Sequence, residues 1–342
     1  SIINLSQGDD IAVDIDGDNF NASIHNDNDC LNPVVYDSDG SIIDSFFGEN
    51  ASDAVVGFAA SSIFIGESYF TEGFAVISGK TLVRNLTDNE LTLVIAHELG
   101  HAFGLDHSQA NINNSETFDS PSCPSAPGDY PLMYPYACRI NQATHPDDQI
   151  SLAMLYPVAD YYNTHGQLTG HFLSGTTPVL GANIWVRETS TGAVYSVVSD
   201  FLMQGTGFFS LVLPAGTYEL HANSINTEFF NGSSVGPYAV DEFDLSFQPP
   251  ASIIGTVTFV ANPPALLTIT AGEATDVTFR TDGSGSLTTG NVITDLSPEH
   301  NTAAVCTPNT ASSGGGGSPS WLVLLTLLCG IPTLRAFASR LK

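Results

Sequence analysis

Three histidines and one glutamate lie within a short segment and have the spacing of a metal-dependent hydrolytic site. His97 and His101 are four residues apart, so on a helix both imidazoles project from one face and can converge on one ion. Glu98 lies one step around such a helix from His97, close to the ion but not bound to it, where it can act as a general base. His107 follows Gly104, which can adopt the positive φ of a sharp turn and return the chain to the ion. Three neutral imidazoles suit Zn²⁺ in a catalytic site, which keeps a fourth position open.

The alternative for these residues is a set of buried helical histidines that hold no ion. Two histidines at this spacing with an intervening glutamate are a weak signal by themselves, because the pattern also arises by chance. Here Gly104 and His107 follow at fixed offsets, after a helix that can be recognised independently. Coincidence then becomes negligible, and the sequence predicts zinc ligands at His97, His101 and His107 with Glu98 as the catalytic base.

The helix that must position these residues is predicted to begin at Thr87 and to end near Gly104. Thr87 and Glu90 have the spacing of a capping box, in which each side chain satisfies a backbone N–H of the first turn. A second helix is predicted over 146–155. The apolar residues of the first helix recur at helical spacing and predict its buried stripe, formed by Leu91, Val94, Ile95, Leu99 and Ala102.

The first 80 residues are predicted to form short strands between polar turns, without an amphipathic helix. Four apolar runs have strand character, at 11–13, 34–36, 55–58 and 74–77. Turns rich in Asp and Gly separate them.

One of these turns allows two interpretations. Asp37 and Asp39 lie in it and Asp44 follows shortly afterwards. The spacing does not match the twelve-position calcium loop of an EF-hand, so these residues form either solvated turns or a Ca²⁺ site made by Asp37, Asp39 and Asp44.

The segment His97–His107 resembles the zinc-binding motif of metzincin peptidases, HExxHxxGxxH, at every defined position. Downstream, the Pro-Leu-Met-Tyr-Pro sequence at 131–135 resembles the Met-turn of that clan in its matrixin-like form. The resemblance implies that Met133 lies under the zinc as an apolar floor and does not bind it. It also implies a zincin-like α+β catalytic domain over 1–157, with a mixed sheet, an active-site helix and an edge strand, assigned to Phe74–Ile77, that binds extended polypeptide substrates.

The matrixin-like pattern covers residues 50–157 and differs from this chain in two respects. Tyr136 stands one place earlier than the tyrosine that lines the matrixin specificity pocket. Matrixin-like domains also begin with a strand and a long helix for which residues 1–80 give no pattern. We therefore expect a preceding part of the catalytic domain, with its leader and any propeptide, to be missing from this chain.

After residue 157 the pattern changes to strands and then to low-complexity sequence. Residues 158–280 alternate in period two between glycine turns and resemble a carboxypeptidase regulatory-like β-sandwich. Residues 281–313 are rich in Ser, Thr, Gly and Asn and are predicted to form a flexible stalk. Residues 314–342, with four glycines, an apolar helix and a basic end, resemble the GlyGly-CTERM sorting signals of Gram-negative bacteria.

That resemblance implies an exported protein. Residues 321–338 would enter the membrane transiently, and a rhomboid-type sorting protease would act near Gly314–Gly317 and deliver the product to the cell surface or the medium. The alternative is a plain C-terminal membrane anchor. An oxidising compartment fits a disulfide between Cys123 and Cys138, and the alternative is that the cysteines are free thiols.

The composition restricts the possible partners. The chain has 36 acidic and 8 basic residues, a net charge of −28, which repels phosphates and excludes a nucleic-acid partner. The sequence predicts a secreted or surface zinc-dependent endopeptidase (a metzincin metalloendopeptidase). The alternative is a zinc-containing surface adhesin or binding module without proteolytic activity.

Overall fold

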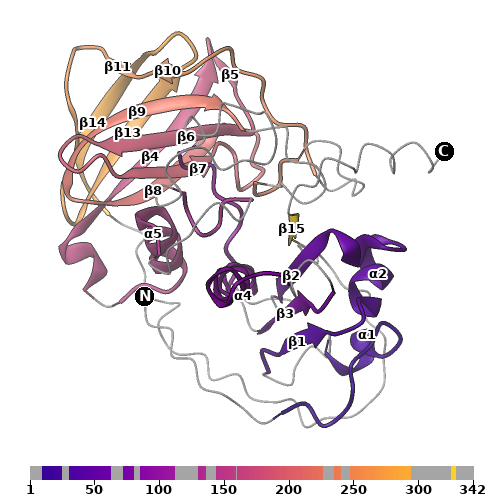
Figure 1. Ribbon diagram of the computed structural model, residues 1–342. Coiled ribbons are helices and arrows are strands. Elements are labelled where there is room, and N and C mark those ends of the chain that lie inside the picture. The colour runs from indigo at the N-terminus through magenta and orange to yellow at the C-terminus, as the bar shows by residue number, and fades with distance from the viewer. Residues whose placement is uncertain are drawn as a thin grey trace, which may run out of the picture. The chain divides into compact units, whose positions relative to one another are not determined.

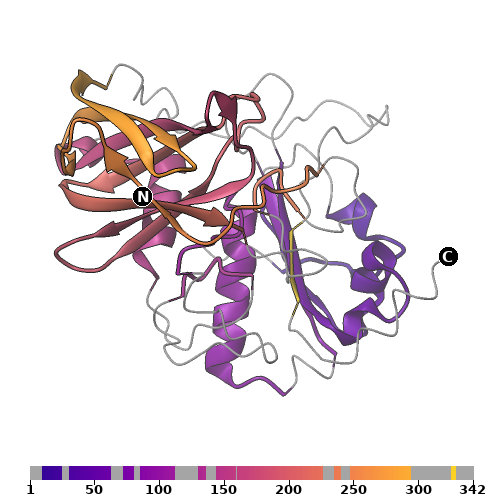
Figure 2. The ribbon, with the colours of Figure 1, turned by 90° about the horizontal axis from the view of Figure 1, so that it is seen from above.

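The computed structural model (Figures 1 and 2) forms two compact units, described here one at a time. The helix–sheet unit holds the described residues up to Leu105 together with 130–135 and 325–328. The two-sheet unit holds Asp106 to Asn111 and the described part of 144–293. The described residues are 10–24, 31–62, 72–80, 85–111, 130–135, 144–158, 160–225, 235–239, 247–293 and 325–328.

The helix–sheet unit is built on a four-stranded mixed sheet of order β1-β3-β2-β15. Strand β3 runs parallel to β1, whereas β2 is antiparallel to both β3 and β15. The strands are β1 (Val34–Asp37), β2 (Val55–Ser62), β3 (Glu72–Ser78) and β15 (Leu325–Leu328). The three predicted strands at 34–36, 55–58 and 74–77 are confirmed. The assignment of Phe74–Ile77 as the edge strand is wrong, because β3 is paired on both sides, by β1 and by β2.

Helices cover both faces of this sheet, as Figure 2 shows. Alternate residues of β2 and β3 point to opposite faces. One face packs under α1 (Phe20–Ser23) and α2 (Ser41–Phe47) in a core rich in phenylalanine: Phe20, Ile42, Ile43, Phe58, Phe74 and Val76. The other face packs against α4 (Asp88–Ala102) through two contact groups: Val56, Ile77 and Val94, and Ala59, Ala75 and Ala102. The 3-10 turn η1 (Ala51–Asp53) leads into β2.

The absence of helices predicted for the first 80 residues is wrong. Asp37 ends β1, and its carboxylate accepts hydrogen bonds from the backbone N–H groups of Ile42 and Ile43 (3.4 and 3.0 Å), so it caps the N-terminal turn of α2. Gly40 precedes α2 with φ +82°, a conformation that L-residues rarely adopt. The apolar residues at 11–13 lie outside any strand. A seven-residue helix is too short for a periodicity signal, so its cap and tertiary contacts decide it.

Helix α4 begins as predicted. Thr87 is the N-cap, its hydroxyl accepts from the backbone N–H of Glu90 (3.3 Å), and the Glu90 carboxylate accepts from the backbone N–H of Thr87 (2.8 Å). Val94 and Ala102 of the predicted stripe are buried, whereas Leu91, Ile95 and Leu99 are half-buried. The most buried face of the helix also contains His97, Glu98 and His101. The predicted second helix is confirmed as α5 (Pro146–Leu155).

The two-sheet unit contains a five-stranded and a six-stranded sheet. Strands β10, β9, β6 and β7 are neighbours in the first, where β12 also pairs with β9. Strands β11, β14, β13, β4 and β5 are neighbours in the second, where β8 also pairs with β4. Their facing side chains form one core that includes Leu168, Phe172, Ile184, Phe209, Leu220 and Phe279. The elements are η4 (Tyr161–Asn163), β4 (His165–Ser174), β5 (Thr177–Pro178), β6 (Ala182–Glu188), β7 (Val194–Val198), β8 (Phe208–Pro214), β9 (Gly216–Ser224), β10 (Val257–Thr258), β11 (Val260–Ala261), β12 (Leu267–Ile269), β13 (Glu273–Arg280) and β14 (Ser284–Val292).

The C-terminal predictions need two corrections. Strand β14 pairs antiparallel with β13, so residues 284–292 belong to a sheet and not to a flexible stalk. In the segment predicted to be an apolar helix, Leu325–Leu328 form strand β15. No helix within the described ranges is both long enough and apolar enough to span a bilayer. Outside those ranges lie all five cysteines, including Cys123 and Cys138, as well as the Gly314–Gly317 run.

Candidate metal and catalytic site

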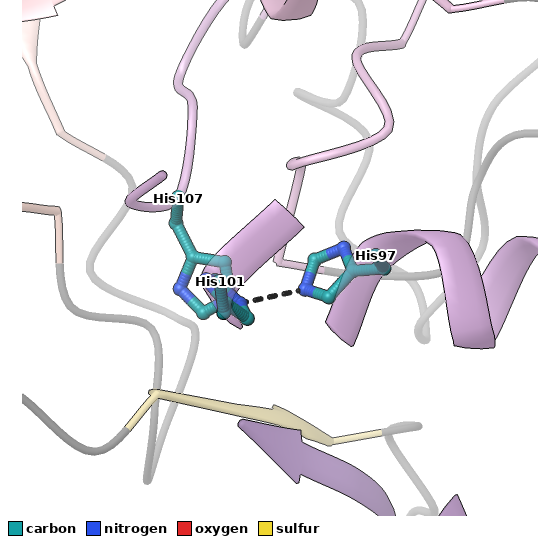
Figure 3. Close-up of side chains that lie close together, drawn as sticks. All are labelled: His97, His101 and His107. Carbon is teal, nitrogen blue, oxygen red and sulfur yellow. Dashed lines mark hydrogen bonds between the residues drawn. The ribbon is translucent and has the colours of Figure 1, made fainter. Parts of the chain in front are cut away.

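The three predicted ligands lie together. His97 and His101 project from one face of α4, and His107 approaches them from the segment beyond the helix (Figure 3). Their ligand atoms all lie within 4.8 Å of one another, and each side chain is at most 3% exposed. The Nε2 atoms of His97 and His101 are 3.0 Å apart. Two nitrogens on one tetrahedral zinc ion are separated by about 3.3 Å, because each Zn–N bond is about 2.0–2.1 Å.

Backbone carbonyls fix which nitrogen of each α4 histidine faces the centre. Nδ1 of His97 donates to the Leu132 carbonyl (2.6 Å), and Nδ1 of His101 donates to the Leu105 carbonyl (2.8 Å). Burial lowers the pKa of His97 to about 4, so its ring is neutral at neutral pH and its Nε2 carries only a lone pair. The short Nε2–Nε2 approach therefore joins two acceptors, which a shared cation would stabilise. This donor set fits Zn²⁺.

Glu98 is a buried carboxylate without a hydrogen-bond partner among the described residues. Its side chain is 0% exposed, and neither Oε1 nor Oε2 contacts a donor. Burial raises the pKa of Glu98 well above its usual value. An unpaired buried carboxylate is costly, and such groups are characteristic of functional sites. A metal ion with a water molecule beside it would supply the missing partners.

Glycines in the sheet make room for Glu98 and for the end of α4. A Cβ added at Gly57 of β2 would lie 3.0 Å from the Cγ and Oε1 atoms of Glu98. A Cβ at Gly73 of β3 would lie 2.3 Å from the Ala102 carbonyl oxygen. The sequence analysis missed both residues. Their signal is an isolated glycine inside a strand pattern, which indicates a close approach of another element.

Met133 lies against the helix, next to the histidines. It is 2% exposed, and a Cβ added at Gly100 would lie 2.3 Å from its Sδ. The preceding residue, Leu132, supplies the carbonyl that orients His97. The segment 131–135 is thus held by both packing and a hydrogen bond to the site. The role of Met133 as an apolar floor stays a prediction.

We expect the substitution Gly100→Ala to destabilise the protein even though alanine is the better helix former. The gain in helix propensity is about 1 kcal/mol, whereas overpacking a buried contact costs about 1–3 kcal/mol. Chemical unfolding should show a net loss in Gly100→Ala. In the double variant Gly100→Ala/Met133→Ala the loss should be smaller than the sum of the two single losses. Additive losses would show that the helix does not contact Met133 at this point.

The three carboxylates considered for calcium all accept backbone hydrogen bonds. Asp39 accepts from the Ser41 N–H (2.9 Å), Asp44 accepts from the Ser52 N–H (2.8 Å), and Asp37 caps α2 as described above. The Lys80 ammonium lies 3.9 Å from the Asp44 carboxylate. Within the described residues, the group with metal-ligand geometry is the histidine triad. Calcium binding by Asp37, Asp39 and Asp44 stays a prediction.

Comparisons with known proteins agree with this geometry. Residues 3–108 match the model of a reprolysin-like family, metallo-peptidase family M12B. The match ends one residue after His107. No functionally curated protein matches the chain.

One solved structure matches weakly. It is a candidate cell adhesion protein from Bacteroides ovatus, with 8% sequence identity and a TM-score of 0.22. The match covers 38% of this chain and 44% of that one, too little for an argument about fold or function. The M12B match and the buried histidine triad together support a zinc metallopeptidase.

Proposed function

We propose that this chain is a zinc-dependent endopeptidase in which Glu98 is the general base. The observation that carries the proposal is the combination of three converging imidazoles with a buried carboxylate that has no hydrogen-bond partner among the described residues. A site that held zinc only for structure would have four protein ligands and no need of an unpaired carboxylate. The reprolysin-like match supports the same reaction class.

Each residue has a distinct part in the proposed mechanism. His97, His101 and His107 would hold the ion, and the carbonyls of Leu132 and Leu105 keep two of the rings in the required tautomer. A bound zinc ion activates water and polarises a peptide carbonyl. Glu98 accepts a proton from the attacking water and delivers it to the leaving amine. Its buried position keeps bulk water from competing for that proton.

Strand β2 is the proposed binding edge for an extended substrate. It lies beyond β3 in the sheet, and its Gly57 faces Glu98 across a close contact. The backbone of β15 pairs with β2 through residues 55–59, so this edge accepts an added antiparallel strand. A polypeptide substrate that paired in the same way would pass its backbone beside the catalytic carboxylate.

The finer assignments are part of the same proposal. We propose a matrixin-like site on the basis of the Met-turn sequence at 131–135, and a carboxypeptidase regulatory-like sandwich in the two-sheet unit. Residues 314–342 are proposed to act as the sorting signal that directs the peptidase to the cell surface or the medium. Cleavage near Gly314–Gly317 would release the mature form.

One experiment tests both activity and export. The gene is expressed in a Gram-negative host, and the medium is assayed with denatured casein and by mass spectrometry of the released protein. We expect casein cleavage that a chelator abolishes and Zn²⁺ restores, together with a product that ends near the glycine run. A purified protein that binds zinc stoichiometrically and leaves casein intact would contradict the endopeptidase and favour a zinc-containing binding module. A released protein that retains residues 321–342 would contradict the sorting signal.

A further inference from the structure

The segment that contains the third histidine is anchored to the two-sheet unit. Asp106 to Asn111 belong to that unit, whereas His97 and His101 are held by α4. Gly104 has φ +89°, so the chain has left the helix before it reaches His107. Helical geometry therefore fixes the first two ligands but not the third. Other contacts must hold His107 in its place.

The principal contact is a buried aspartate that joins both sides of this attachment. The Ser108 hydroxyl donates to Oδ2 of Asp147 (2.5 Å), and the backbone N–H of Ser196 in β7 donates to Oδ1 (2.7 Å). Asp147 is 3% exposed and lies in the first turn of α5, where His145 is the N-cap. The two oxygens of one carboxylate thus connect the residue next to His107 with a strand of the two-sheet unit.

Three further contacts continue along the same segment. The Gln109 carbonyl accepts from Nδ2 of Asn183 in β6 (3.3 Å). Ala110 is 0% exposed and packs against Trp185 of β6 and Val194 of β7. Nδ2 of Asn111 lies 3.1 Å from Nε2 of His145, which uses its other nitrogen to cap α5. His145 is thus a structural residue, not a fourth ligand.

We propose that Asp147, together with β6 and β7, positions His107 for zinc, so that the two-sheet unit is a working part of the metal site. The proposal depends on the proposed function only in taking His107 as a ligand. A ligand whose surroundings are loosened must be ordered when the ion binds, and that ordering weakens binding. Loss of a group that orients a metal ligand typically lowers metal affinity by about 10–100-fold.

The test measures zinc affinity of the full chain by competition with a chromophoric chelator, without any assay of activity. We expect Ser108→Ala and Asp147→Ala to weaken zinc binding by about 10–100-fold. Asp147→Asn should largely restore affinity, because its amide oxygen can still accept from Ser196 and its amide nitrogen can meet the Ser108 hydroxyl. Burial raises the pKa of Asp147 to about 7, so a neutral amide suits this environment.

Two control variants separate positioning from loss of stability. Ser199 is a buried serine whose hydroxyl accepts from the Ala182 N–H and donates to the Val179 carbonyl, all within the two-sheet unit. Asp200 is 2% exposed and accepts from the N–H groups of Gly205, Thr206 and Gly207. Ser199→Ala and Asp200→Ala should lower the unfolding midpoint as much as the test variants and leave zinc affinity unchanged. Their positions match the test residues in chemistry but not in connection to His107.

A second readout is the Co²⁺-substituted protein. Cobalt held by three fixed imidazoles gives tetrahedral absorption bands, and these should weaken or shift in Ser108→Ala and Asp147→Ala but not in the two controls. Unchanged affinity and spectra in both test variants would overturn the positioning role, as would equal losses in the controls. A wild-type chain that bound no zinc would instead contradict the proposed function. The two failures are thus distinguishable.

Discussion

The variant Glu98→Gln is expected to bind zinc as tightly as the wild type and to lose peptide hydrolysis by about 10²–10⁴-fold, the usual contribution of a general base. Glutamine has the same shape but cannot accept a proton from water. The three imidazoles and the carbonyls that orient them are untouched by the change. The measurements are kcat/KM on an internally quenched peptide and zinc content per chain.

The matched control is Glu90→Gln. It makes the same substitution in the same helix, at an exposed position where glutamine also completes a capping box. Its activity should equal that of the wild type. If Glu98→Gln retained full activity, the proton would have to be accepted elsewhere, and the assignment of Glu98 would fail. If it lost zinc as well as activity, the residue would have a structural role.

Burial of Glu98 also predicts the sign of a stability change in the zinc-free chain. Because its pKa is raised in the folded state, the folded chain holds a proton that the unfolded chain releases above its ordinary carboxyl pKa. Wild-type stability without zinc should therefore fall as the pH rises above about 4.5, and Glu98→Gln should lack this loss. The difference in unfolding midpoint between the two proteins should grow from pH 4 to pH 7.

Local sequence signals were sufficient for the elements that carry most of the site. The capping box at Thr87 and the offset of four between His97 and His101 depend on residues within one helix, and both are found as predicted. Helix α2 was missed because its N-terminal turn is capped by a carboxylate from the preceding strand, which a short apolar run does not reveal. Strand β14 was missed because its polar, glycine-containing sequence resembles a linker, and pairing with β13 decides it.

The long-range parts of the site could not be read from the sequence. The Leu132 carbonyl that orients His97 lies 35 positions away along the chain, and Gly57 faces Glu98 only once β2 has packed under α4. The contact between Ser108 and Asp147 likewise depends on where the chain returns. Motif spacing identifies ligands that share a helix, whereas the groups that orient them come from elsewhere in the fold.

His101→Ala is expected to produce the largest loss of zinc affinity among single substitutions. His101 is the middle ligand of the motif, lies 3.0 Å from His97 between the two Nε2 atoms, and is 1% exposed. Tight protein zinc sites have binding free energies of about 10–16 kcal/mol, so one ligand corresponds to about 3–4 kcal/mol, or about 10²–10³-fold in affinity. Peptide hydrolysis should be lost at ordinary zinc concentrations.

The substitution also separates the metal from the fold. Removing the imidazole leaves a cavity next to the buried Leu105 carbonyl, so some loss of stability is expected in the zinc-free chain. His165→Ala is the control, since this half-buried histidine donates to the Tyr161 carbonyl (3.0 Å) in the two-sheet unit. Both variants lose a ring and a hydrogen bond to a carbonyl, but only His101→Ala should lose zinc. Raising free Zn²⁺ by the measured affinity ratio should restore metal occupancy in His101→Ala and only part of its activity, because two imidazoles leave the ion free to shift relative to Glu98. Full zinc affinity in this variant would show that the ion, if bound, is held by other residues, and the three-histidine centre would have to be abandoned.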